Sequence, residues 1–248
     1  RTSSASRYWG SASGQAALMI ALMNILQAGD HVLASSTIYG GTFNLFGVTL
    51  KKYGIESTFV DLDLSLEELQ KFVKPNTRAV FGETIANPAI TVLDIEKFAA
   101  LAHRNGIPLL VDNTFATPIL CRPKEFGADI VIHSTSKYMD GHAVQLGGAI
   151  VDLGTFDWNN GKFPGLSEPD ESYHGLVYTK SFGNAAYITK ARVQLMRDLG
   201  ACPTAMGAFL LNLGLETMPV RMERHCRNAE RVAEFLEKNP KVEFVKYP

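Results

Sequence analysis

Short, mostly apolar runs alternate along this chain with longer stretches of helical composition. The apolar runs predict six strands, at residues 31–35, 56–60, 78–82, 107–111, 128–132 and 148–151. Segments rich in good helix formers predict helices between them, at residues 14–28, 42–53, from Ser65 onward and 94–105. This alternation of strand and helix indicates an α/β protein.

Capping signals support the predicted helix ends. Ser65 and Glu68 have the spacing of a capping box, in which each side chain accepts a hydrogen bond from the other residue's backbone N–H. Asp94 is a typical N-cap for the helix that ends before Gly106. Gly54 follows the 42–53 segment, and glycine readily ends a helix because it adopts the left-handed conformation.

Continuous apolar strands that alternate with helices are typical of a parallel sheet that is covered on both faces. We therefore predict a three-layer α/β/α sandwich with a mainly parallel sheet. In such sheets, ligands bind beyond the carboxyl ends of the strands. The residues that follow the predicted strands are consequently the first place to look for chemistry.

The pattern changes after Val151. Residues 152–181 contain Gly, Pro, Trp and Tyr without a clear period, and they predict a long ordered loop of the kind that is often functional. Three helices are expected after this loop, at residues 184–199, 204–215 and 220–238. A further strand is expected at 242–245.

These boundaries predict three units of unequal size. Residues 1–12 are polar and rich in serine, and we expect them to be irregular. Residues 13–238 are expected to form one large domain. Residues 239–248 are expected to be the start of a C-terminal domain that is largely missing from this chain.

Composition narrows the classes of partner. The 248 residues include 24 Lys plus Arg and 25 Asp plus Glu, a balance that gives no reason to expect nucleic acid or a membrane as partner. The three cysteines, Cys121, Cys202 and Cys226, are far apart and form no CxxC pair. They favour reduced thiols in a cytoplasmic protein over a disulfide framework, and we predict no metal site.

Polar residues with useful chemistry lie at the ends of the predicted strands and at the start of the first helix. After the strands come Tyr39, Glu83, Asn87, Asp112, Ser134, Ser136 and Lys137. At the start of the first helix come Ser13, Gly14 and Gln15. Because parallel strands have their carboxyl ends at one edge of a sheet, we expect these residues to lie near one another.

Together these residues provide what pyridoxal phosphate (PLP) requires from a protein. Lys137 supplies an amine that can form a Schiff base, and Asp112 supplies an acid for the pyridine nitrogen, which keeps the ring an electron sink. The phosphate can bind the free N–H groups of the helix N-terminus and the hydroxyls of Ser134 and Ser136. Tyr39 can stack on the ring.

Each residue has a simpler interpretation when it is taken alone. Lys137 could be a surface lysine, Asp112 a helix cap and Tyr39 a core aromatic residue. His133 and His142 are expected to have only structural roles. The combination favours a PLP site over a nucleotide-binding α/β protein, since neither GxGxxG nor GxxxxGKS/T occurs at a strand–helix junction.

Five motifs resemble those of a known family. They are SGQAA at residues 13–17, YGGT at 39–42, ETIANP at 83–88, VDNTFATP at 111–118 and HSTSKYMDGH at 133–142. In these motifs and their order, the chain resembles the Cys/Met-metabolism PLP enzymes of fold type I. The resemblance implies PLP as the cofactor and the large domain of that fold.

The resemblance also implies a role for each candidate residue. Lys137 would carry the cofactor and move protons, Asp112 would pair with the pyridinium nitrogen, and Tyr39 would stack on the ring, which makes these three the expected catalytic residues. The phosphate contacts would come from Ser13, Gly14, Gln15, Ser134 and Ser136. Asn87 and the neighbouring Glu83 would lie near the cofactor's 3-hydroxyl.

A further resemblance narrows the activity. The stretches at residues 163–178 and 196–206 resemble O-acetylhomoserine sulfhydrylases. This implies replacement of the acetate of O-acetyl-L-homoserine by sulfide, giving homocysteine for methionine biosynthesis, in a homotetramer. A methionine or cystathionine γ-lyase, a cystathionine γ-synthase and a catalytically inactive scaffold with the same fold remain alternatives.

Overall fold

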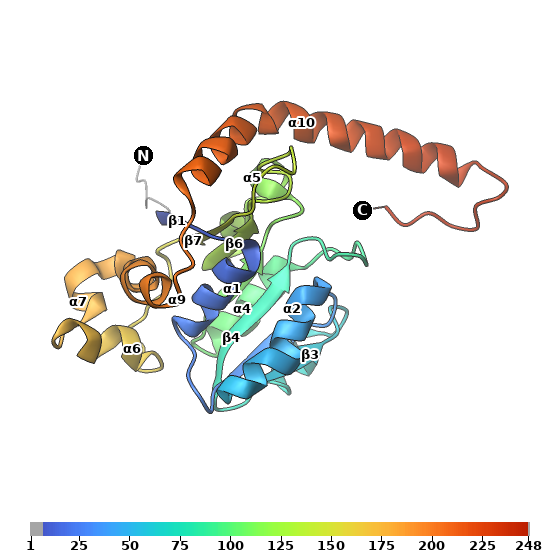
Figure 1. The fold of residues 1–248 in the computed structure, drawn as a ribbon. Helices are drawn as coiled ribbons and strands as arrows, with labels where there is room; N and C mark the ends of the chain where they lie inside the picture. Colours follow the sequence, from blue (N-terminus) through green and yellow to red (C-terminus); the bar gives the residue numbers. More distant parts are fainter. Residues whose placement is uncertain (1–6, 248) are drawn as a thin grey trace.

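The computed structural model describes residues 7–247, and it has the predicted α/β architecture with a sheet between helices (Figure 1). The seven strands follow the order β1-β7-β6-β5-β4-β2-β3. Their bounds are Arg7–Ser11 (β1), His31–Ser35 (β2), Glu56–Val60 (β3), Thr77–Glu83 (β4), Leu109–Asp112 (β5), Ile130–Ser134 (β6) and Gly148–Asp152 (β7). The sheet is parallel from β3 to β6, whereas β7 is antiparallel to both β6 and β1.

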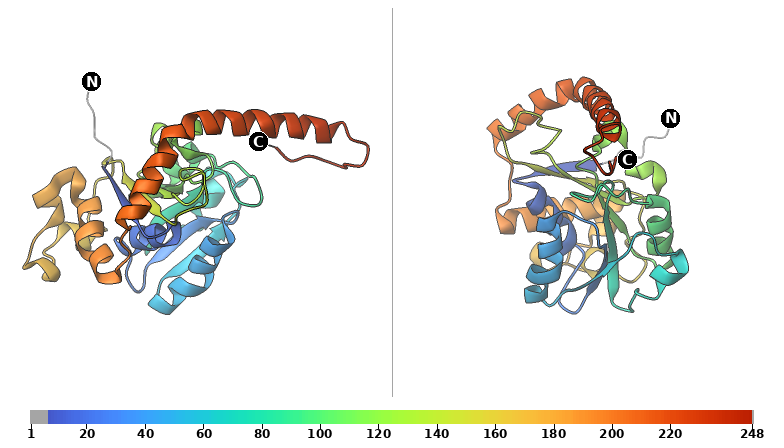
Figure 2. Two further views of the ribbon diagram at one scale, coloured as in Figure 1. Left: turned by 45° about the horizontal axis from the view of Figure 1, so that its top comes forward. Right: turned by 90° about the vertical axis from the view of Figure 1, so that its right-hand side faces the viewer.

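Helices cover both faces of this sheet (Figure 2). α1 packs against β6 and β7 on one face, and α4 packs against β4 and β5 on the other. The helices are α1 (Gly14–Met23), α2 (Gly40–Asn44), α3 (Leu66–Gln70), α4 (Ile95–Arg104), α5 (Thr117–Leu120), α6 (Pro164–Ser167), α7 (Tyr178–Phe182), α8 (Ala186–Lys190), α9 (Arg197–Leu199) and α10 (Ala205–Glu237). α2 continues through a π turn at Leu45–Thr49 and a 3-10 turn at Leu50–Tyr53.

The helix starts predicted from the Ser65 and Asp94 capping signals are confirmed. Asp94 Oδ1 accepts a hydrogen bond from the Lys97 backbone N–H at 2.9 Å, which caps α4. The capping box is also present, because the Glu68 N–H donates to Ser65 Oγ at 3.3 Å and the Ser65 N–H donates to Glu68 Oε2 at 2.9 Å. α4 buries Phe98 completely against the sheet, and truncation of such a side chain to alanine typically costs about 3–5 kcal/mol.

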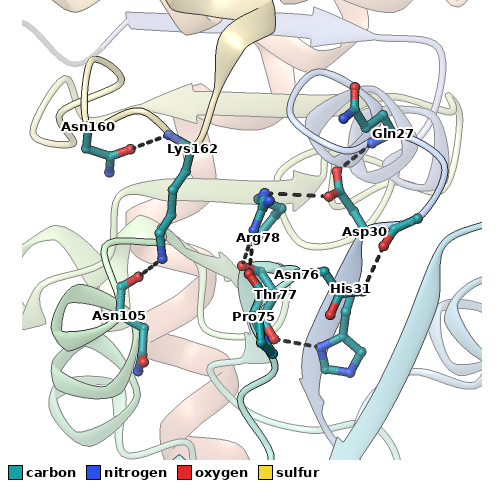
Figure 3. A network of polar contacts seen from close by, with 11 residues as sticks. Gln27, Asp30, His31, Pro75, Asn76, Thr77, Arg78, Asn105, Asn160 and Lys162 are labelled. Carbon is teal, nitrogen blue, oxygen red and sulfur yellow. Dashed lines mark hydrogen bonds and ion pairs between the residues drawn. The ribbon is translucent and has the colours of Figure 1, made fainter.

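A polar network ties together the amino-terminal ends of β2 and β4 (Figure 3). Arg78 Nε lies 3.5 Å from Asp30 Oδ1. His31 is fully buried, and its two ring nitrogens each lie 2.8 Å from a hydroxyl oxygen, of Thr77 and of Thr58. Burial lowers the pKa of His31 to about 4, so its ring is neutral at physiological pH. This network fixes the end of the sheet that lies opposite the predicted site.

Two expectations about the ends of the chain are corrected. Residues 7–11 are not irregular but form β1, which pairs with β7 along its whole length. This partner lies far away in the sequence, so no local pattern could reveal it. The strand expected at 242–245 is absent, because these residues form a bend and irregular backbone and belong to none of the described strands. Residues 1–6 of the expected N-terminal segment lie outside the described residues.

Two expectations about the second half of the chain are also corrected. The loop expected at 152–181 contains α6, a 3-10 turn at Glu171–Tyr173 and the start of α7. The two helices expected at 204–215 and 220–238 are the single helix α10, with Pro219 in its interior. Proline usually breaks a helix because it lacks an N–H. Here, buried contacts on both sides of Pro219 hold the helix together, and α10 changes direction along its length (Figure 1).

Candidate active site

Three of the candidate side chains lie on one face of the sheet at its carboxyl-terminal edge. Glu83, at the end of β4, pairs in register with Asp112, at the end of β5. Asp112 pairs in turn with Ile132 of β6, and Ser134 follows two residues later. Because side chains alternate between the two faces of a strand, Glu83, Asp112 and Ser134 share one face. The structure therefore brings these predicted residues together.

The N-terminus of α1 meets this edge of the sheet at Ser134. Ser13 caps the helix, since its Oγ accepts a hydrogen bond from the Ala16 N–H at 3.1 Å. A Cβ at Gly14 would lie 2.5 Å from Ser134 Cβ, so only glycine permits this approach. The free N–H groups of the first turn and the positive end of the helix dipole consequently lie beside the Ser134 side chain, an arrangement that favours an anion.

Contacts with neighbouring elements hold Tyr39 and Gln15. The Tyr39 backbone N–H donates to Glu83 Oε1 at 2.8 Å, which ties the start of α2 to the end of β4. The Tyr39 side chain is 46% exposed and can contact a ligand. Gln15 Nε2 donates to Thr42 Oγ1 at 3.2 Å and so joins α1 to α2. The backbone N–H of Gln15, in the first turn of α1, can still bind an anion at this helix N-terminus.

Glu83 is a buried carboxyl group that is only 6% exposed. Burial, and after it the charge of Asp112, raises the pKa of Glu83 to about 8, although the backbone N–H groups of Tyr39 and Asn87 oppose the shift. Glu83 therefore holds a proton at neutral pH. Asn87 itself is exposed at the rim of the site.

Asp112 is the carboxyl group at the end of β5. Burial raises its pKa, and hydrogen bonds from Thr114 oppose the shift, including one from the Thr114 N–H to Asp112 Oδ1 at 2.9 Å. Within residues 7–247, no Lys, Arg or His forms an ion pair with it. A nearby positive charge would stabilise the ionised form of such a group. The position thus fits a ligand that carries a protonated ring nitrogen.

Lys137 lies on the turn that follows β6. Its side chain is exposed, and no hydrogen bond or ion pair engages its amino group in the described part of the chain. The Gly141 N–H donates to the Lys137 carbonyl oxygen at 2.8 Å and orders the turn. The Ser136 hydroxyl, in contrast, already accepts a hydrogen bond from the Gly147 N–H at 2.9 Å. The Lys137 amine is therefore available to a ligand, whereas the Ser136 hydroxyl is partly engaged.

Sequence reasoning missed Thr114, which links the strands at the site. Its hydroxyl accepts a hydrogen bond from the Ser134 backbone N–H at 2.7 Å, and its own N–H donates to Asp112. Thr114 thus fixes the ends of β5 and β6 relative to each other. Its place within VDNTFATP, just beyond an apolar strand, is the signal that could have identified it.

The two histidines near Lys137 make other contacts. His142 Nδ1 lies 2.7 Å from the carbonyl oxygen of Asp140. His133 is buried on the opposite face of β6 from Ser134, and burial lowers its pKa to about 4. His133 lines a largely apolar cavity of about 590 Å³ beside β6, β7 and α10, which is separate from the candidate site. Among the described residues, no cluster of three His, Cys, Asp or Glu could hold a metal.

Known proteins resemble this chain over nearly its whole length. The family described as Cys/Met metabolism PLP-dependent enzyme matches residues 3–248. An O-acetyl-L-homoserine sulfhydrylase of Leptospira meyeri is 48% identical over 245 residues, which cover 96% of this chain and 55% of the relative. A homocysteine synthase of Schizosaccharomyces pombe is 48% identical over 239 residues, covering 95% and 56%. The chain thus spans about half the length of these relatives.

Two solved structures share the fold. An O-acetylhomoserine (thiol)-lyase of Campylobacter jejuni has a TM-score of 0.93 and 41% identity, with 97% of this chain and 59% of that chain covered, and it contains N'-pyridoxyl-lysine-5'-monophosphate. An O-acetylhomoserine sulfhydrylase of Wolinella succinogenes has a TM-score of 0.86 and 35% identity, with 97% and 65% covered. The sheet and helices described above are therefore those of a PLP-dependent enzyme fold.

Proposed function

Because this chain belongs to the Cys/Met metabolism PLP-dependent enzyme family, we propose that the whole protein is a sulfhydrylase of methionine biosynthesis. It would replace the acetate group of O-acetyl-L-homoserine with sulfide and release homocysteine and acetate. The observation that carries this choice of reaction is the 48% identity of the chain to an O-acetyl-L-homoserine sulfhydrylase. The unengaged Lys137 amine and the Asp112 carboxyl, which has no cationic partner among residues 7–247, support PLP chemistry.

The residues of the site fit PLP. Asp112, a carboxyl with no cationic partner among residues 7–247, would face the ring nitrogen, and Lys137 would carry the cofactor through its amine. The phosphate would lie at the α1 N-terminus, where Gly14 leaves room beside Ser134. When bound, PLP supplies an electron-withdrawing ring that stabilises negative charge at the substrate α-carbon. Further contacts would come from Ser13, Gln15, Tyr39, Glu83, Asn87 and Ser136.

Lys137 is the residue that would move protons. As a free amine, its Nζ would accept the proton from the α-carbon of the substrate, and a second proton would leave the β-carbon. Acetate would then depart with the electron pair of the γ-carbon–oxygen bond, and hydrosulfide would form the new bond at that carbon. The two protons would return to the β- and α-carbons, so that homocysteine keeps both. Asp112 would hold the proton on the ring nitrogen throughout.

Ser136 needs only one change of partner to bind a phosphate. Its Oγ accepts a hydrogen bond from the Gly147 N–H at 2.9 Å, and this bond can persist. Its donated bond to the Gly147 carbonyl oxygen is longer, at 3.3 Å. A phosphate oxygen is a stronger acceptor because it is charged. The hydroxyl hydrogen would therefore turn from the Gly147 carbonyl to the phosphate.

The rival activities differ in substrate, so assays on the full-length protein separate them. With PLP, O-acetyl-L-homoserine and sulfide, we expect the protein to form homocysteine and acetate in equal amounts. Faster turnover with L-cysteine in place of sulfide would identify a cystathionine γ-synthase. Cleavage of methionine or cystathionine without a nucleophile would identify a γ-lyase. A folded protein that turns over none of these substrates would be an inactive scaffold.

The same family membership is the basis for two further inferences, about assembly and location. We infer a homotetramer, a dimer of dimers, which light scattering of the full-length protein would test. We infer that the protein is cytoplasmic, which cell fractionation would test. In the described part of the chain, no helix combines the length and apolar character needed to cross a bilayer.

A further inference from the structure

Helix α10 holds the turn that carries Lys137. Arg221 Nη1 donates to the carbonyl oxygen of Tyr138 at 2.8 Å, and Arg221 Nη2 lies 3.4 Å from the carbonyl oxygen of Met139. Tyr138 and Met139 directly follow Lys137. Arg221 lies 83 and 82 positions away from them in the sequence, so these contacts depend on the tertiary fold.

The rest of the guanidinium group is held by α10 itself. Arg221 Nη2 donates to the Gly214 carbonyl oxygen at 2.7 Å, and Nε donates to Thr217 Oγ1 at 3.0 Å. Pro219 lies inside this part of the helix, two residues before Arg221. Arg221 therefore joins the helix turn around Pro219 to the turn that carries Lys137.

Two glycines allow α10 to come this close. A Cβ at Gly214 would lie 2.3 Å from the Asp140 carbonyl oxygen and 2.5 Å from that of Met139. A Cβ at Gly141 would lie 2.3 Å from Arg221 Nη1, and Gly141 also has a φ of 72°. A side chain at Gly214 would collide with the backbone of the turn, and one at Gly141 would displace the Arg221 guanidinium group. The backbone on both sides of the contact is thus shaped to receive the guanidinium group.

The hydrogen-bond partners of Arg221 indicate that it holds the backbone in place. Its donors are used by backbone carbonyls and one hydroxyl, and within residues 7–247 no carboxylate forms an ion pair with it. A guanidinium group engaged in this way fixes the backbone, because its planar donors have defined directions.

We propose that Arg221 is a positioning residue for Lys137. It acts through the backbone of Tyr138 and Met139 and sets where the Lys137 amine can reach. α10 extends well beyond the sheet (Figure 1), so Arg221 also links the Lys137 turn to the part of the chain that follows. The inference rests on the proposed function, in which Lys137 carries the cofactor and moves the proton.

The test compares four variants of the full-length holoenzyme. Arg221→Gln removes the charge and shortens the side chain. Arg221→Lys keeps the charge, but its single nitrogen cannot reach both the Gly214 carbonyl of α10 and the Tyr138 carbonyl after Lys137. Arg224→Gln removes an exposed cation from the same helix. Thr204→Ala removes the N-cap of α10, whose Oγ1 accepts a hydrogen bond from the Gly207 N–H at 2.9 Å, and so weakens the helix away from Lys137.

Displacement of a reacting group by about 1 Å can reduce a rate about 100-fold, so we expect Arg221→Gln to lower kcat about 10- to 100-fold with little change in KM. Arg221→Lys should recover part of this loss, and the two control variants should keep the wild-type kcat. Wild-type kcat in Arg221→Gln would overturn the proposal. If Arg221→Gln does not fold, wild-type kcat in Arg221→Lys would overturn it instead.

Two other measurements show whether Arg221 positions Lys137 or only stabilises α10. They also do not depend on which reaction the protein catalyses. The pH midpoint of the cofactor's visible absorption band should move in Arg221→Gln and not in Thr204→Ala. In the cofactor-free protein, the rate at which an acylating reagent modifies Lys137 should likewise change in Arg221→Gln and stay at the wild-type value in Thr204→Ala. Equal changes in Thr204→Ala would overturn the proposal. If wild-type protein carries PLP on Lys137 but lacks sulfhydrylase activity, the proposed function fails, and these readouts still decide the role of Arg221.

Discussion

Glu83 and Asp112 are neighbouring carboxyl groups, paired in register across β4 and β5 on the face that the candidate site occupies. Burial and the charge of Asp112 raise the pKa of Glu83 to about 8, and burial also raises the pKa of Asp112. Two adjacent buried carboxyls do not ionise together readily, so the pair favours holding one proton. A proton on Glu83 leaves Asp112 able to pair with a cationic ring nitrogen.

The raised pKa of Glu83 makes the stability of the cofactor-free protein depend on pH. Between pH 4.5 and about 8, the folded state holds a proton that the unfolded chain releases, so the free energy of unfolding falls as the pH rises through this window. The loss is up to about 5 kcal/mol for a shift of this size. Glu83→Gln should therefore be more stable than wild type at pH 8.5 by a larger margin than at pH 5. Urea unfolding at the two pH values measures this, and an identical pH dependence in both proteins would contradict it.

Gly14→Ala should weaken cofactor binding. The new Cβ would lie 2.5 Å from Ser134 Cβ and push the α1 N-terminus away from the sheet edge. Overpacking of this kind costs about 1–3 kcal/mol, so the Kd for PLP should rise about 5- to 150-fold. Gly47→Ala is the matched control, because a Cβ there meets only Phe59 at 3.7 Å. Equal PLP affinities of the two variants in a fluorescence titration would exclude this role of Gly14.

His31 should contribute to acid destabilisation. Its pKa is about 4 in the folded state, compared with 6.5 ordinarily, so the unfolded chain takes up a proton between these values and the folded state does not. The free energy of unfolding therefore falls as the pH is lowered from 6.5 to 4, by up to about 3 kcal/mol. His31→Gln should be less stable than wild type at pH 7 and lose less stability on going to pH 4.5. A loss as large as that of wild type would show that His31 does not drive the transition.

The central sheet and the positions of several candidate residues at its carboxyl-terminal edge followed from local sequence patterns. β2 and β3 have the predicted bounds, and the predicted caps of α3 and α4 are present, because strand alternation and capping depend on a few neighbouring residues. The placement of Asp112 and Lys137 at one edge followed from a general property of parallel sheets, in which all carboxyl ends lie together.

Features that depend on distant contacts were not predicted. β1 forms because β7 offers it a partner, and α10 continues past Pro219 because Met218 and Met222 pack against Met139. The contact of Arg221 with the Lys137 turn is of the same kind. No local pattern encodes these pairings, since each exists only after the sheet has assembled. The interaction of Ser136 with Gly147 is another example.

Lys137→Ala should remove activity without unfolding the protein. The side chain is exposed and makes no hydrogen bond or ion pair in the described structure, so its loss should leave the melting temperature unchanged. Loss of a general acid–base group typically reduces the rate about 10²- to 10⁴-fold, and loss of the cofactor attachment point adds to this. Lys52→Ala, another exposed lysine, should keep wild-type kcat. Equal turnover of the two variants would exclude Lys137 from the mechanism.

The attachment point of the cofactor tests the central claim most directly. The full-length protein would be loaded with PLP, reduced with borohydride, digested and mapped by mass spectrometry. We predict loss of the visible absorption band on reduction and a single pyridoxyl phosphate adduct, located on Lys137. An adduct on a different lysine, or a folded protein that yields no adduct at all, would contradict the account.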